Sequence, residues 1–157
     1  MTYEETLHYL YTSIPVFQHS GASAYKPGLG TSIALDDYLG NPHKAYKTIH
    51  VAGTNGKGSV SHLLAAILRQ SGFKVGLYTS PHLVDFRERI RVNGKKISQD
   101  YVVDFVERHR SFFEPLHPSF FELTSSMAFE YFRDQQVDYA VIEVGLGGRL
   151  DSTNIIT

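Results

Sequence analysis

Along this chain, segments with a hydrophobic pattern typical of strands alternate with segments that have a pattern typical of helices. This order of segments predicts an α/β fold. Short apolar runs with β-branched residues are typical of buried strands; they lie at 47–52, 74–79 and 138–144. Other segments repeat apolar residues every three or four positions, which is typical of helices; they lie at 2–12, 31–40, 60–70, 99–113 and 120–134. A helix that joins two such strands predicts a βαβ crossover and therefore a parallel sheet.

Local signals refine this pattern. Residues 89–97 alternate around Asn93-Gly94, a strong hairpin signal, so we expect a loop and a small hairpin to project at the end of the second strand. Ser98 is a suitable N-cap for the next helix. The helix predicted over 120–134 is apolar over much of its surface and should be largely buried.

A glycine-rich loop joins the first strand to the helix after it. Its sequence is Val51-Ala52-Gly53-Thr54-Asn55-Gly56-Lys57-Gly58-Ser59. Such strand–loop–helix units bind phosphate because inward-pointing N–H groups and the helix start attract anions, and Lys57 adds a full charge for the β- and γ-phosphates. The match to G-x-x-x-x-G-K-[ST] is imperfect, since Val51 replaces the first glycine and Gly58 follows the lysine. The loop predicts a nucleotide site, with a structural turn as the alternative.

Ligands of open α/β sheets bind beyond the carboxyl ends of the strands, where three segments should meet. These are residues 53–59, residues 79–82, and Glu143 with the glycines after it. Mg²⁺ on a nucleotide prefers hard oxygen ligands, which a carboxylate at a strand end supplies. Burying Glu143 unpaired would be costly, so it needs a metal or another partner such as Arg149 or a helix N-terminus. Ser80 could give the same ion a neutral oxygen, or simply cap a turn.

Three further features have weaker chemical interpretations. His50 and His82 could act in catalysis, but most such histidines are structural. Gly145-x-Gly147-Gly148 after a strand is similar to a dinucleotide fingerprint, but Leu150 occupies the final glycine position. A set of basic residues could attract an anionic substrate or form an ordinary solvated face. The set is Arg87, Arg89, Arg91, Lys95 and Lys96.

Composition excludes several classes of function. The 157 residues suffice for one domain with a core, and 42% hydrophobic and 20% charged residues are ordinary for a soluble protein. A net charge of −1 predicts no nucleic-acid or membrane partner. The absence of cysteine excludes disulfides, thiolate metal sites and thiol catalysis. The acidic start of the chain does not fit a signal peptide, and no run reaches the roughly 18 apolar residues of a membrane span, so we expect a cytoplasmic protein.

Three sequence blocks, in order and at suitable intervals, resemble the folylpolyglutamate synthase and dihydrofolate synthase family of the wider Mur-ligase group. The blocks are 51–59, Thr79-Ser80-Pro81-His82-Leu83 and 143–154, of which Arg149-Leu150-Asp151 is especially specific. A glycine after the loop lysine is normal in this family. The resemblance implies an ATP-dependent amide ligase that requires Mg²⁺. It would join L-glutamate to a carboxylate of a reduced folate or dihydropteroate through an acyl phosphate.

The resemblance also implies roles for single residues. ATP binding falls on Thr54, Asn55, Gly56, Lys57, Gly58 and Ser59, and Mg²⁺ binding on Ser80 and Glu143. Lys57 and Glu143 would support catalysis by positioning and charge neutralisation. Pterin binding falls on Lys26, Pro27, Gly28, Leu29, Ser119, Phe120, Phe121, Glu122, Leu150, Asp151 and Ser152. Lys26-Pro27 departs from the form typical of the bifunctional enzymes, so the pterin preference stays open. Two aromatic residues at a helix start also fit an ordinary core.

The same resemblance predicts the domain organisation. It implies a P-loop-type, mainly parallel sheet flanked by helices, with residues 1–157 forming the N-terminal part of an ATP-binding domain. In the family a further metal-ligand histidine, a modified lysine, the rest of the sheet and a second domain follow. We therefore expect these residues alone to lack ligase activity, and the full-length protein to be a monomer.

Three alternatives remain open from the sequence. The first is a P-loop ATPase or phosphotransferase that forms no amide. The second is a nucleotide-binding regulatory module. The third is a cell-wall ligase of the Mur type, which residues 79–82 and 145–151 disfavour.

Overall fold

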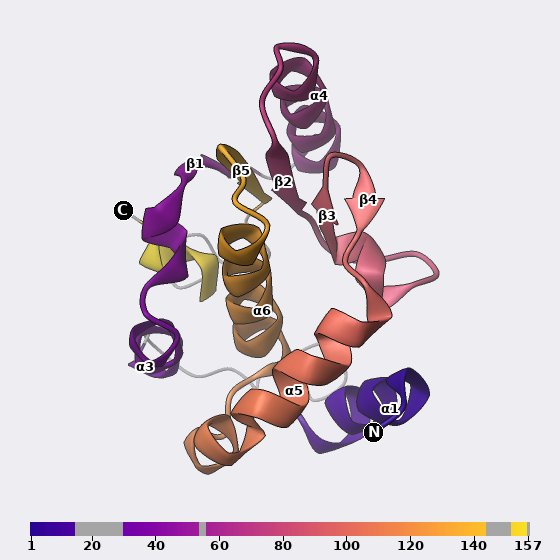
Figure 1. Ribbon diagram of the computed structural model, residues 1–157, viewed down its shortest axis with the longest axis vertical. Coiled ribbons are helices and arrows are strands. Elements are labelled where there is room, and N and C mark those ends of the chain that lie inside the picture. The colour runs from indigo at the N-terminus through magenta and orange to yellow at the C-terminus, as the bar shows by residue number, and fades with distance from the viewer. Residues whose placement is uncertain (15–29, 54–55, 144–151, 157) are drawn as a thin grey trace.

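Five strands form one mixed sheet at the centre of the molecule (Figure 1). In their order across the sheet they are β1 (Lys47–Val51), β5 (Tyr139–Glu143), β2 (Val75–Tyr78), β3 (Ile90–Val92) and β4 (Lys95–Lys96). The first three are parallel, β3 is antiparallel to β2, and β4 is antiparallel to β3. This computed structural model describes residues 1–14, 30–53, 56–143 and 152–156.

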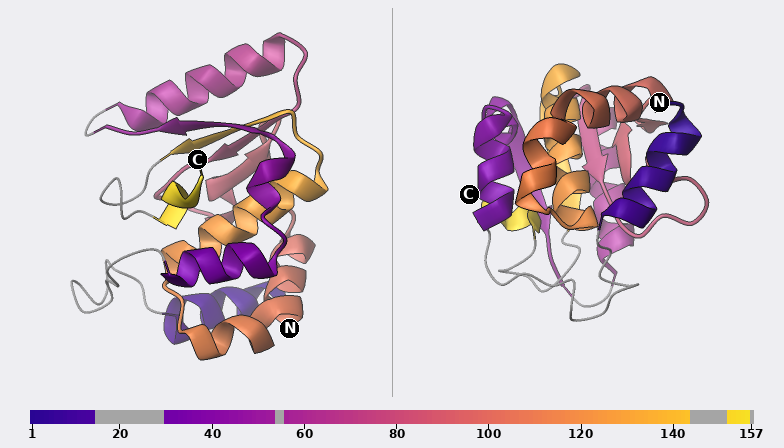
Figure 2. Two further views of the ribbon diagram at one scale, coloured as in Figure 1. Left: turned by 90° about the vertical axis from the view of Figure 1, so that its left-hand side faces the viewer. Right: turned by 90° about the horizontal axis from the view of Figure 1, so that it is seen from below.

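Helices cover both faces of the sheet (Figure 2). The α-helices are α1 (Tyr3–Ser13), α3 (Gly30–Tyr38), α4 (Lys57–Gln70), α5 (Gln99–Phe113) and α6 (Phe120–Asp134). Short 3₁₀ helices lie at Pro42–Ala45, Phe86–Arg89, Glu114–Leu116 and Ser152–Ile155. Helix α4 lies alone on one face, whereas α6 crosses the other face with α3, α5 and α1 beyond it. In the ranges that the structure describes, no helix is long and apolar enough to span a lipid bilayer.

The two inner parallel strands, β2 and β5, are mostly apolar because both of their faces are buried. Val75, Leu77 and Val141 point to α4, where they pack with its apolar side. The residues between them point the other way: Tyr78, Ala140 and Ile142 belong to the larger core built around α6. The apolar runs therefore correctly predicted three parallel strands, of which β2 and β5 are buried and β1 is buried only at Val51.

The sequence pattern also predicted the two long helices to the residue. Helices α5 and α6 span 99–113 and 120–134, and their N-caps Ser98 and Ser119 accept hydrogen bonds from backbone N–H groups three residues ahead. Helix α6 is largely buried, as its wide apolar surface required.

The small hairpin predicted after the second strand is present as β3 and β4, but the expectation that it projects from the sheet was wrong. Strand β3 instead pairs with β2 and makes the hairpin part of the sheet. The loop between the two strands lets the chain reverse, and the free edge of β2 can then supply hydrogen bonds to an antiparallel strand. Pairing also buries Ile90 and Val92, which would otherwise be exposed.

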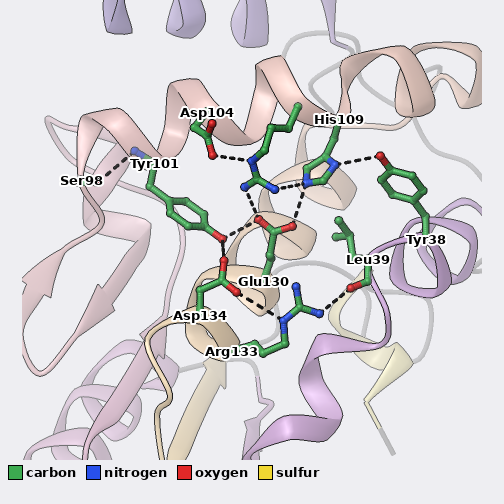
Figure 3. A network of polar contacts seen from close by, with 10 residues as sticks. Tyr38, Leu39, Ser98, Tyr101, Asp104, His109, Glu130, Arg133 and Asp134 are labelled. Atoms are coloured by element: carbon green, nitrogen blue, oxygen red, sulfur yellow. Dashed lines mark hydrogen bonds and ion pairs between the residues drawn. The ribbon is translucent and has the colours of Figure 1, made fainter.

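A buried carboxylate joins α5 to α6 on the helical side of the molecule (Figure 3). Glu130 of α6 is only 2% exposed. It accepts hydrogen bonds from three side chains of α5: Tyr101 at 2.6 Å, Arg108 at 2.8 Å and His109 at 2.9 Å. Burial alone raises the pKa of Glu130, but the hydrogen bonds from His109, Arg108 and Tyr101 outweigh it and lower the pKa to about 2.

This network predicts a specific acid sensitivity. A carboxyl pKa lowered on folding adds stability that is complete above the unfolded value of 4.5 and is lost as the pH falls towards about 2. We expect Glu130→Gln to lower the free energy of unfolding at pH 7 by about 3 kcal/mol. The variant should also lose less stability than wild type between pH 5 and pH 2. Urea unfolding across this pH range measures both effects, with the exposed Glu107→Gln as control. Parallel pH profiles for wild type and Glu130→Gln would contradict this account.

Candidate active site

The glycine loop leads directly into the start of α4. Strand β1 ends at Val51, and Gly56 precedes Lys57, the first residue of the helix. Gly56 has a φ of 73°, a left-handed conformation that glycine adopts without strain. The first N–H groups of an α-helix have no partners within it, so this end carries partial positive charge. Thr54 and Asn55 lie outside the described residues, so the structure describes only the second half of the predicted ATP loop.

Glu143 is the residue at which the three predicted segments meet. It is the last residue of β5 and lies in register with Val51 at the end of β1. Its Oε1 accepts a hydrogen bond from the backbone N–H of Ser80 at 3.3 Å, just beyond the end of β2. Its Oε2 lies 3.7 Å from the position that a Cβ on Gly58 would occupy, in the first turn of α4. The structure therefore brings the loop, the segment after β2 and the carboxylate together at one edge of the sheet, as predicted.

The Glu143 carboxylate is buried, and no cation among the described residues pairs with it. It is 4% exposed, and within the described part of the chain its one hydrogen bond comes from Ser80 and it forms no ion pair. A buried carboxylate with so little compensation is unfavourable, although the start of α4 offsets part of this cost.

This donor set fits Mg²⁺. The ion typically takes one or two carboxylates and completes its shell with phosphate oxygens and water. Residues 1–14, 30–53, 56–143 and 152–156 hold no group of three His, Cys, Asp or Glu side chains suited to a metal. An ion here would therefore depend on Glu143, on a neutral oxygen such as that of Ser80, and on the phosphates of a nucleotide.

The two candidate histidines have structural partners. His50 Nε2 lies 2.7 Å from the hydroxyl of Thr153, which links β1 to the last described segment. His82 Nδ1 accepts a hydrogen bond from Nε of Arg89 at 2.7 Å, and its Nε2 lies 3.1 Å from the Tyr11 hydroxyl. Burial and the neighbouring charge of Arg89 lower the pKa of His82, so the ring is neutral at pH 7. Both ring nitrogens are engaged, which disfavours a role as a general base.

The predicted basic cluster is partly neutralised and partly buried. Arg87 and Lys96 both pair with Asp85, at 3.1 and 3.8 Å, and Arg89 is buried at 4% exposure. Pairing with Asp85 and the burial of Arg89 weaken the interpretation of the cluster as a binding surface for an anion.

Known proteins resemble this chain over most of its length. The dihydrofolate synthase/folylpolyglutamate synthase of Bacillus subtilis is 42% identical over 138 residues, which are 83% of this chain and 32% of that protein. A crystal structure of folylpolyglutamate synthase from Thermotoga maritima has a TM-score of 0.87 at 48% identity and matches 99% of this chain. A folylpolyglutamate synthase complex with AMPPCP and folate has a TM-score of 0.87 at 40% identity and matches all of it. The chain belongs to the folylpolyglutamate synthase and dihydrofolate synthase family.

Two facts qualify this membership. The chain spans about a third of the length of these relatives, 32% of the Bacillus protein and 36% and 38% of the two structures. No protein-family model matches the chain.

The predicted pterin positions of this family member are only partly described. Lys26 to Leu29, Leu150 and Asp151 lie outside the described residues, and Ser152 begins the last short 3₁₀ helix. Ser119 and Glu122 form a capping box at the start of α6, with mutual hydrogen bonds of 2.8 and 3.1 Å. Their side chains thus serve the helix, and their contact with a pterin stays a prediction.

Phe120 and Phe121 differ in accessibility. The ring of Phe120 is 1% exposed and lies among Tyr11, Phe86 and Arg89, so in this structure it belongs to the core. Phe121 is half-buried and is the more accessible of the two for a planar ligand. Sequence reasoning missed the partners of Phe120, because no local pattern joins residues so far apart in the chain.

The cost of burying Glu143 gives a test in the absence of any ligand. Replacing the carboxylate with an amide of the same shape removes a buried charge that the described residues compensate only in part. We therefore expect Glu143→Gln to raise the free energy of unfolding by about 1 kcal/mol in metal-free buffer. Ligand-induced stabilisation by Mg²⁺ with AMPPCP should be lost in this variant. Thermal unfolding with and without the ligands measures both. A variant that is less stable without ligand, and still stabilised by them, would contradict this interpretation.

Proposed function

We propose that this chain forms the ATP- and Mg²⁺-binding part of an amide ligase that adds L-glutamate to a carboxylate of a reduced folate or dihydropteroate. The single observation that carries the proposal is the meeting of Glu143, Ser80 and the start of α4 at the carboxyl edge of a parallel sheet. Membership in the family supports the reaction type, and a relative bound to AMPPCP and folate supports the two substrates.

The site suits a reaction in which the protein does little covalent work. A carboxylate oxygen of the folate substrate attacks the γ-phosphorus of ATP, and the bond to the β,γ-bridging oxygen breaks to release ADP. The amino group of glutamate then attacks the acyl phosphate, loses a proton and displaces phosphate. Charge gathers on the phosphate oxygens in the first step, where the Lys57 ammonium and the N–H groups at the start of α4 would stabilise it.

Glu143 and Ser80 are the residues that would hold Mg²⁺. When bound, the ion would neutralise phosphate charge and fix the orientation of the triphosphate. The low exposure of Glu143 keeps water from competing for its carboxylate, which strengthens the electrostatic contacts at this edge of the sheet.

The whole protein is proposed to be longer than this chain. Its relatives are about three times as long, which supports the assignment of residues 1–157 to the N-terminal part of an ATP-binding domain followed by a second domain. We accordingly expect no ligase activity from these residues alone, and we propose a cytoplasmic monomer for the full-length protein.

The complete protein with Lys57→Ala tests the proposal. We expect kcat for glutamate-dependent ADP release to fall by about 10²- to 10³-fold, because a positioned charge on the transferred phosphoryl group is lost. The matched control is Lys44→Ala, which removes an exposed lysine distant in sequence from the loop. Activity is measured with ATP, Mg²⁺, folate and glutamate, with mass spectrometry of the glutamylated product.

Other results would favour the alternatives. ADP release that does not depend on glutamate would favour an ATPase or phosphotransferase. Biological activity retained by Lys57→Ala would favour a regulatory nucleotide-binding module. Failure to bind a pterin in calorimetry would favour a cell-wall ligase.

A further inference from the structure

The segment that carries Ser80, residues 79–85, is held by backbone hydrogen bonds at both of its ends. The backbone N–H of Thr79 donates to the carbonyl oxygen of Arg89 at 3.0 Å, and that of Ser80 donates to Glu143 at 3.3 Å. Three consecutive N–H groups, those of residues 83–85, donate to the carboxylate of Glu88 at 2.9, 3.2 and 3.0 Å. Between these two anchored stretches, the side chain of His82 fixes the turn.

His82 links two distant elements through its two ring nitrogens. Because Nε of Arg89 donates to Nδ1 at 2.7 Å, the proton of the neutral ring resides on Nε2. This Nε2–H faces the hydroxyl oxygen of Tyr11 on α1, 3.1 Å away. The ring therefore acts as a fixed connector between α1 and the short helix that ends at Arg89.

Burying the charged side chain of Arg89 costs free energy, so its position calls for a physical reason. Its side chain is 4% exposed, and among the described residues it has no carboxylate partner. Its Nη1 is buried with no hydrogen-bond partner. Its charge lies 5.1 Å from the centre of the Phe120 ring, which gives it partial compensation. A leucine or methionine would fill such a position more cheaply, but neither could donate a hydrogen bond to His82.

The same aromatic ring fixes the other end of the connection. Tyr11 stacks on Phe120 with ring centroids 5.3 Å apart, so Tyr11 and Arg89 both pack on one residue at the start of α6. The rotamer of each side chain is thus restricted by a rigid element. Both side chains contact His82, so this restriction reaches His82, which lies two positions after Ser80 in the chain.

We propose that Tyr11 and Arg89 act through His82 as positioning residues that hold Ser80 beside Glu143 in the geometry that a divalent cation requires. This proposal rests on the proposed function, because it assigns Ser80 and Glu143 to the cation. Groups that orient metal ligands without touching the metal typically change metal affinity by 10- to 100-fold when they are removed.

The first test measures cation binding in the complete protein. Mn²⁺ is titrated in the presence of AMPPCP and followed by electron paramagnetic resonance, a readout independent of turnover. We expect Tyr11→Phe and His82→Phe each to weaken Mn²⁺ binding by about tenfold. Tyr9→Phe is the matched control, because Tyr9 lies on the same helix and its hydroxyl donates a comparable hydrogen bond, to Glu114 at 2.8 Å. It should leave Mn²⁺ affinity unchanged.

A second test uses no ligand. Amide hydrogen exchange over residues 79–85 should be faster in His82→Phe and Tyr11→Phe than in wild type, and unchanged in Tyr9→Phe. His82→Asn should restore only part of the protection and affinity, because its side-chain oxygen can occupy the place of Nδ1 and accept from Arg89 but no group of it reaches Tyr11.

The outcomes separate this proposal from the function it rests on. Wild-type protein that binds no Mn²⁺ with AMPPCP would overturn the proposed function and the positioning role together. Wild-type binding that Tyr11→Phe and His82→Phe leave intact, with unchanged exchange, would overturn the positioning role alone. Equal losses of Mn²⁺ affinity and of exchange protection in all variants, Tyr9→Phe included, would indicate a general loss of stability. This result would also overturn the positioning role.

Discussion

The burial of one carboxylate at the carboxyl edge of a parallel sheet is the constraint on which the site depends. Glu143 ends the middle of three parallel strands, so the chain must bring the segments after the two neighbouring strands close to it. The start of α4 reaches it from one side and the N–H of Ser80 from the other. The described residues place no cation there, so this part of the structure is complementary to a positive charge.

A second buried glutamate shows what the fold does when a carboxylate has only a structural role. Glu130 receives hydrogen bonds from three side chains of α5, two of them from basic residues (Figure 3). Glu143 is about as buried, yet the residues that the structure describes give it a single hydrogen bond, from a backbone N–H. The two carboxylates are buried to a similar extent, but they differ in how many hydrogen bonds offset the cost of burying their charge. Among the described residues Glu143 receives fewer, and this difference makes it the better candidate to bind a ligand.

Local chemistry explains how much of this could be predicted from the sequence. Helices and strands followed from periodicity, and the cap at Ser98 from residue type, because these signals are confined to a few neighbouring positions. The convergence on Glu143 followed from the rule that parallel strands end at one edge. The pairing of β3 with β2 was missed, since the edge that a hairpin joins depends on the path of the whole chain. The contacts of His82 with Tyr11 and Arg89 were also missed, because they join residues up to 71 positions apart.

The most direct test of the central claim is the position of a divalent ion in the complete protein. Crystals grown with Mn²⁺ and AMPPCP give an anomalous signal that locates the ion without assumptions about its ligands. The account predicts one strong peak about 2.1 Å from a carboxylate oxygen of Glu143, with the phosphates at the start of α4. Bound AMPPCP with the ion away from Glu143, or phosphates away from Gly56–Ser59, would contradict it.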